Sequence, residues 1–114
     1  MLIRMFALIL SGGLCLHSSN LSALTVEQFI GICDSFPGDC SDHPRLHAYV
    51  GGALDLIATL DEETAYLEAF YCRASPGLFD VPAIIRFMER HREGNAARNA
   101  MVLVVRYLED NGKC

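Results

Sequence analysis

The sequence predicts an all-α protein, namely a small disulfide-stapled four-helix bundle after an N-terminal signal peptide. Three observations lead to this prediction. Apolar residues recur at intervals of three and four along most of the chain, which is the spacing of amphipathic helices. The segments between these runs are short and rich in Gly, Pro, Asp and Asn, as helix connections are. The chain has 114 residues, a single-domain length, and carries five cysteines.

Residues 1–23 resemble a secretory signal peptide. One basic residue, Arg4, precedes an apolar run from Met5 to Leu16, and a polar segment with small residues follows it. The apolar run is shorter than the roughly 20 residues that a membrane-spanning helix needs. We therefore expect cleavage after Ala23, export of the protein, and a mature domain over residues 24–114 without a membrane anchor.

The first helix is predicted from a capping box formed by Thr25 and Gln28, and it runs to about Cys33. The apolar residues of its inward face are Val26, Phe29 and Ile30. The turn-rich segment "DSFPGDCSDHP" then connects it to the second helix.

Pro44 suits the first turn of the second helix. The apolar positions at helical spacing are Leu46, Tyr49, Val50, Ala53, Leu54, Ile57 and Leu60. Gly51 and Gly52 each cost a helix up to about 1 kcal/mol relative to Ala, so we expect another element to pack closely there. The following segment, residues 61–77, is either a short helix that ends near Phe70 or an irregular connection.

Asp80 is the expected N-cap of a third helix. Its inward residues are Val81, Ile84, Ile85 and Met88. Gly94 is expected to end this helix and Asn95 to cap a fourth, which Gly112 terminates. The residues predicted to be buried on the fourth helix are Ala97, Met101, Val104, Val105 and Leu108.

The charge of the chain argues against some classes of partner. Nine Lys and Arg residues stand against fourteen Asp and Glu, which gives −5, and loss of Arg4 makes the mature chain −6. No basic stripe dominates a face, so we do not expect nucleic acid as a partner. Residues 24–80 contain two basic and ten acidic residues, which indicates either an acidic surface for a basic partner or a solvated face.

The cysteines and histidines do not predict a metal or an active site. The spacing of Cys33, Cys40, His43 and His47 loosely resembles a zinc pattern, but the cysteines are widely spaced and the expected compartment is oxidising. Signal cleavage leaves an even set of four cysteines, for which oxidised pairing is expected. A catalytic thiol would have to be free. We therefore expect no metal, no cofactor and no enzymatic activity.

A set of motifs in a fixed order resembles one known family. Cys33 is followed by Tyr49-x-x-Gly52-x-x-Asp55, then by "FYC" ending at Cys72, then by a helix ending "FMERHRE", and finally by an Ala-rich helix that closes on Cys114. This order resembles the Rap/Tai family of periplasmic immunity proteins, which neutralise peptidoglycan amidases delivered by type VI secretion. The likeness covers essentially the whole mature chain.

The resemblance implies a periplasmic protein that inserts a loop into the cleft of an amidase and blocks its catalytic Cys–His pair. Exposure and charge suggest two contact regions. They comprise the acidic stretch Asp61, Glu62 and Glu63 and the helix junction residues Arg92, Glu93, Asn95 and Arg98. A homodimer is compatible with the family. The alternative functions are an acid-stress chaperone of the periplasm and an adaptor subunit of an envelope assembly.

Tyr49, Gly52 and Asp55 lie three apart on one side of the second helix, and we interpret them as a structural motif. Gly52 would let another helix approach, Tyr49 would pack with its hydroxyl at the rim, and Asp55 would accept a hydrogen bond from a neighbouring element.

The spacing of the cysteines favours a local bridge between Cys33 and Cys40, which flank one loop. Cys72 and Cys114 would then pair and pin the end of the chain. The crossed pairings stay open, because sequence alone does not set connectivity.

Overall fold

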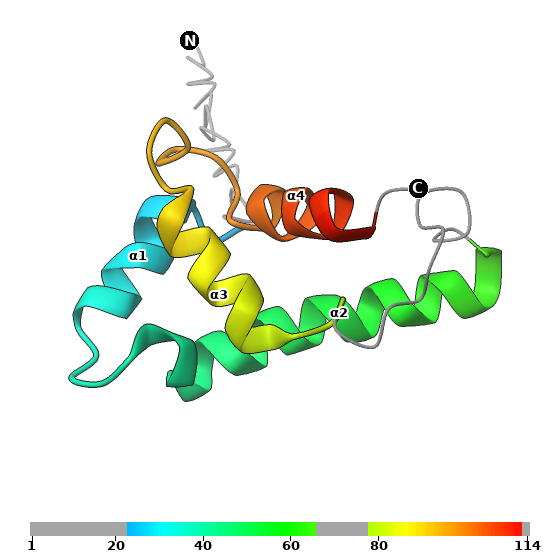
Figure 1. Cartoon of the computed structure of the whole chain (residues 1–114), viewed down its shortest axis with the longest axis horizontal. Helices are drawn as coiled ribbons and strands as arrows, with labels where there is room; N and C mark the ends of the chain where they lie inside the picture. The colour runs from blue at the N-terminus through cyan, green and yellow to red at the C-terminus, as the bar shows by residue number, and fades with distance from the viewer. Residues whose placement is uncertain (1–22, 66–77, 113–114) are drawn as a thin grey trace, which may run out of the picture.

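The computed structural model describes residues 23–65 and 78–112. These residues form four α-helices, namely α1 (Val26–Asp34), α2 (Pro44–Thr64), α3 (Val81–Arg90) and α4 (Met101–Gly112), with a short 3-10 turn η1 (Cys40–Asp42) after α1. Figure 1 shows α2 as the long element of the molecule, with the other three helices gathered on one side of it. The predicted all-α bundle is therefore confirmed, and within the described ranges strand-type pairing is limited to one isolated bridge between Thr25 and Asn99.

Some predictions fall on other parts of the chain. Residues 1–22 of the expected signal peptide, residues 66–77 with Cys72, and Cys114 lie outside the described residues. Of the segment 61–77, residues 61–64 form the last turn of α2. Among the helices that are described, none is long and apolar enough to cross a membrane.

The start of α1 follows the prediction. The Gln28 backbone N–H donates to Thr25 Oγ1 at 3.2 Å, and the Thr25 N–H donates to Gln28 Oε1 at 3.0 Å. This capping box satisfies a helix-end donor that has no partner inside the helix. The buried face of α1 consists of Val26, Phe29, Ile30 and Cys33.

The loop after α1 is closed by the predicted local disulfide. Cys33 and Cys40 are bonded, with their Cα atoms 5.0 Å apart, and both are buried. The bond joins the C-terminal end of α1 to η1, which in turn packs against α2 and α3. The short loop is thus tied to the core at both ends.

The first half of α2 packs as predicted, whereas its second half does not. Leu46, Val50 and Leu54 are buried, but Leu60 is 45% exposed. The 21-residue helix is longer than the core it covers, so the apolar spacing continues past the point where neighbours are available. Leu60 as an inward residue was therefore a wrong prediction, and Leu56 on the same half is also exposed.

The expectation of close packing at the α2 glycines is also wrong. No described atom lies within 4 Å of the position that a Cβ would take at Gly51 or Gly52. Of the rest of the motif, Tyr49 packs against Phe29 with ring centroids 6.3 Å apart, while Asp55 is exposed. Of the three roles assigned to the motif, only packing by Tyr49 is observed among the described residues.

α3 begins where predicted, because Asp80 Oδ1 accepts a hydrogen bond from the Ala83 N–H at 3.0 Å. Ile84, Ile85 and Met88 are buried as expected. The buried Phe87 was not foreseen. Its ring stacks on His91 at 3.8 Å and meets Tyr107 of α4 edge-on at 5.4 Å.

α4 starts later than predicted and turns a different face inward. It begins at Met101, whose N–H donates to Asn99 Oδ1 at 2.9 Å, so Asn95 is not its cap. Leu103, Val104 and Leu108 are buried, whereas Val105 is 46% exposed and Ala97 precedes the helix. The cause is that residues 96–100 bond to the start of α1 and are therefore not helical.

We expect Gly52→Ala to stabilise the fold by up to about 1 kcal/mol, because the helix gains propensity and the new methyl group meets no described atom. Urea denaturation of the mature domain measures this. A destabilised variant would contradict the open space seen at Gly52.

We expect the double variant Cys33→Ala/Cys40→Ala to lose about 2.5 kcal/mol of unfolding free energy, because the bond closes a short loop in the unfolded chain. Denaturation of the double variant beside the wild type, both non-reduced, measures the loss. Equal stability of the two proteins would show that the bond adds no constraint.

Candidate functional site

The segment between α3 and α4, residues 91–100, is called the junction below. Its backbone is bonded to the first turn of α1. The Val26 N–H donates to the Arg98 carbonyl at 2.9 Å, and the Glu27 N–H donates to the Ala96 carbonyl at 3.0 Å. The first N–H groups of a helix have no acceptor within the helix. Here the junction supplies carbonyl acceptors for two of these N–H groups. The path of the junction is therefore fixed against α1.

Asn95 braces the junction from inside. It is buried, and its Nδ2 donates to the His91 carbonyl at 2.8 Å and to the Glu93 carbonyl at 3.2 Å. Its Oδ1 lies 3.4 Å from Arg98 Nη1. Gly94 adopts a positive φ of 74°, a conformation that glycine enters at little cost. The junction is thus shaped by internal hydrogen bonds and by one glycine turn.

The other predicted contact residues of the junction face solvent. Arg92, Glu93 and Arg98 are exposed. Asn95 differs from them, since its amide is used within the chain, and it positions the loop instead of offering a contact. Between the charged residues the exposed positions carry small side chains, which keeps this part of the loop narrow; they are Gly94, Ala96 and Ala97.

The second predicted contact region lies elsewhere. Glu62 and Glu63 are exposed and Asp61 is half-buried, all in the last turn of α2. Figure 1 shows this end of α2 at the opposite end of the bundle from the junction. The structure therefore does not bring the two predicted contact regions together.

Two grooves flank the junction. The α1 groove has a volume of about 400 Å³ and is lined by Val26, Glu27, Ile30, Gly31, Asp34, Arg92 and Ala96. The α4 groove has a volume of about 420 Å³, and its charged lining residues are Arg98, Arg106 and Glu109. Sequence reasoning missed both grooves. The spacing of Glu27, Gly31 and Asp34 along one exposed face of α1 was a local signal, but nothing local indicates that Arg92 and Ala96 form the opposite wall.

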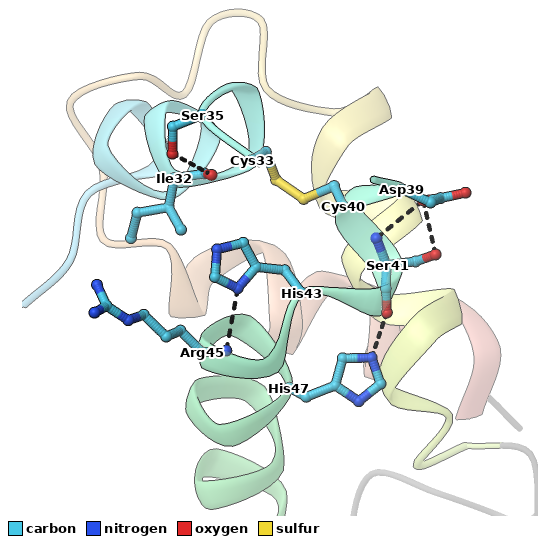
Figure 2. Close-up of a disulfide and its surroundings, with 9 residues drawn as sticks. All are labelled: Ile32, Cys33, Ser35, Asp39, Cys40, Ser41, His43, Arg45 and His47. Carbon is cyan, nitrogen blue, oxygen red and sulfur yellow. Dashed lines mark hydrogen bonds between the residues drawn. A yellow bond between two sulfur atoms is a disulfide. The ribbon is translucent and has the colours of Figure 1, made fainter. Parts of the chain in front are cut away.

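Figure 2 shows how the residues of the loosely zinc-like pattern are used. The sulfurs of Cys33 and Cys40 are bonded to each other. His43 Nδ1 accepts a hydrogen bond from the Arg45 N–H at 3.1 Å and so caps α2. His47 Nε2 contacts the Ser41 carbonyl, which requires the ring to donate from that nitrogen. One ring nitrogen of His43 therefore serves the start of α2, and one ring nitrogen of His47 serves the loop before it.

η1 is held in place by a further side chain that is visible in Figure 2. Asp39 Oδ1 accepts hydrogen bonds from the Ser41 N–H at 3.0 Å and from Ser41 Oγ at 2.8 Å. The backbone and side-chain bonds from Ser41 lower the pKa of Asp39 below its ordinary value. Asp39 consequently keeps a negative charge at this end of the molecule.

Glu89 of α3 lies beside the disulfide. One of its carboxylate oxygens and the two sulfurs of Cys33 and Cys40 lie within 4.8 Å of one another. Because the sulfurs are bonded to each other, this group does not offer thiolates to a metal. Burial raises the pKa of Glu89, and the negative charges of Asp39 and Asp34 raise it further, against the opposing effect of nearby arginines.

This raised pKa predicts a pH-dependent effect of Glu89→Gln. The folded state favours the protonated carboxyl of Glu89. The contribution of this group to the free energy of unfolding is therefore fully present below the unfolded pKa of about 4.5, and it is lost as pH rises through the folded pKa. We therefore expect Glu89→Gln to raise the melting temperature slightly at pH 7, with a gain below about 1 kcal/mol because solvent screens the site. The gain should vanish near pH 4, and thermal melts across pH 4 to 7 measure it. A gain that does not change with pH would contradict the assignment.

Comparison of the chain with protein-family models, with curated proteins and with solved structures finds no match. The motifs of this chain and the geometry of its junction are therefore what indicate a function.

Proposed function

We propose that this protein is a periplasmic immunity protein that binds a peptidoglycan amidase delivered by type VI secretion and blocks its active site. Two kinds of support underlie the proposal. The sequence carries motifs in the order typical of the Rap/Tai family, from Cys33 to Cys114. The observation that carries the mechanism is the junction, a narrow loop whose backbone is bonded to α1 and braced by the buried Asn95.

A braced loop suits inhibition by occlusion. Ordering a loop on binding costs free energy, and a loop that already holds its bound shape avoids much of that cost. The bonds from Asn95 to His91 and Glu93 and from α1 to Arg98 provide such an arrangement here. Occlusion also needs no reactive group in the inhibitor, because it only has to keep substrate and water from the amidase.

The side chains of the junction suit a cleft. Small exposed residues such as Ala96 and Ala97 leave the backbone slim enough to enter, while Arg92, Glu93 and Arg98 offer charged contacts on either side. The junction is therefore the element that enters the cleft, and the acidic stretch at the end of α2 makes at most a secondary contact.

Co-purification tests the function. The full-length tagged protein is expressed in the strain that also makes the products of the neighbouring genes, recovered from the periplasm, and the proteins bound to it are identified. A single amidase in a stoichiometric complex, with its activity falling as the complex forms, is the expected result. Many clients in place of one amidase, increasing at acid pH, would favour the chaperone alternative and contradict immunity.

Charge exchange separates the two candidate contact regions. We expect Arg92→Glu/Glu93→Arg to weaken amidase binding at least about tenfold, which is about 1.4 kcal/mol, because the loop keeps its shape but presents the wrong charges. The comparison variant is Glu62→Lys/Glu63→Lys at the far end of α2, for which we expect a smaller loss. Calorimetric titration of both variants measures the affinities. The reverse ranking would assign the main contact to the acidic stretch.

A further inference from the structure

The α1 groove runs along an exposed face of α1 next to the junction. Glu27 and Asp34 lie two turns apart on this face, and Gly31 lies between them. No described atom lies within 4 Å of the position that a Cβ would take at Gly31, so the middle of the groove is open. The buried Ile30 supplies an apolar surface, and Arg92 and Ala96 of the junction form the other wall.

The α1 wall of this groove is negative. Glu27 and Asp34 are both exposed carboxylates. Asp34 is the last residue of α1, where the helix dipole is also negative, and the last turn of α1 contains no basic residue. The nearby carboxyl of Glu89 feels the charges of Asp34 and Asp39, which raise its pKa in addition to the effect of burial.

The other wall contributes one cation, Arg92, and the uncharged Ala96. The two carboxylates therefore outnumber the positive charge within the groove. An anionic occupant would be repelled by α1, and a purely apolar occupant would strip water from two carboxylates without replacing their hydration. A cation on an aliphatic stem avoids both costs, because its methylene groups cover Ile30 and its head stays near the carboxylates.

We infer that the α1 groove receives a lysine or arginine side chain from the rim of the partner's cleft when the junction enters that cleft. This inference rests on the proposed function. Arg92 and Ala96 belong to both the junction and the groove, so a partner that surrounds the junction lies within reach of the groove.

The substitution Gly31→Lys tests the inference without harming the fold. The new side chain fills the open middle of the groove and places its own ammonium near Glu27, four residues earlier, a pairing that stabilises helices. Replacing a helical glycine also raises helix propensity. The variant should therefore melt at a higher temperature than the wild type while its binding site is occupied by its own lysine.

Gly51→Lys on α2 is the matched control. Gly51 is also helical, and no described atom lies within 4 Å of its Cβ position. We expect both variants to melt above the wild type, Gly31→Lys to bind the amidase at least tenfold more weakly, and Gly51→Lys to bind within twofold of the wild type. Unchanged binding of Gly31→Lys would overturn the inference while leaving the immunity function intact.

A second measurement tests the groove without any amidase. The peptide acetyl-Ala-Lys-Ala-amide at millimolar concentration should shift the amide NMR signals of Glu27, Gly31 and Asp34 in the wild type. The same signals should not move with acetyl-Ala-Glu-Ala-amide, and the lysine peptide should not move them in Gly31→Lys. The wild type could show shifts with the lysine peptide and yet bind no amidase. That result would refute the immunity function but support the binding of a cationic side chain in the α1 groove. Equal signal shifts with the two peptides, or no shifts with either, would overturn the inference that the α1 groove binds a cationic side chain.

Discussion

The hydrogen bonds between the start of α1 and the junction are the constraint on which the rest of the structure depends. The N–H groups of Val26 and Glu27 bond to junction carbonyls, and the N–H of Gln28 bonds to Thr25 Oγ1. The next N–H, that of Phe29, reaches the Thr25 carbonyl. Every donor of the first turn is thus satisfied, and leaving one buried and unpaired would cost about 1–3 kcal/mol. The beginning of α1 therefore needs the segment before α4 in order to be complete.

This dependence explains where α4 begins and which of its faces turns inward. Because residues 96–100 form turns whose backbone is bonded to the start of α1, α4 begins only at Met101, and the Ala100 N–H donates to the Leu24 carbonyl. The register of α4 follows, with Leu103 turned inward and Val105 outward. The same bonds hold the junction beside α1, so the fold itself sets the surface next to the junction.

Local signals account for what the sequence could predict. The capping box at Thr25, the Asp80 cap and the apolar stripe that includes Ile84 each depend on residues within one or two helical turns. The Cys33–Cys40 bond closes a short loop and was foreseen for the same reason, although the other pairings stayed open.

The errors have non-local causes. Gly94 followed by Asn95 has the local form of a helix stop and a new cap, but the Asn95 amide bonds backward to the His91 carbonyl. The acceptors for α1 lie about seventy residues from their donors, and no pattern in either segment announces them. The periodicity of α2 likewise indicates which residues share a face of the helix, but not where along the helix the core ends. For this reason Leu60 is exposed although its spacing predicts burial.

Departures from local stability rules tend to gather at functional sites, because elsewhere selection removes them. In this chain two such departures lie at the same end of the bundle. Asp34 places a carboxylate at the negative end of α1, and Glu89 is partly buried near Asp34 and Asp39. The helix starts at Thr25 and Asp80, by contrast, have favourable caps. The last turn of α2 also carries carboxylates at a negative helix end, namely Asp61, Glu62 and Glu63, so a cation from outside would relieve repulsion at either end. What distinguishes the junction end is its braced backbone, which is bonded to α1.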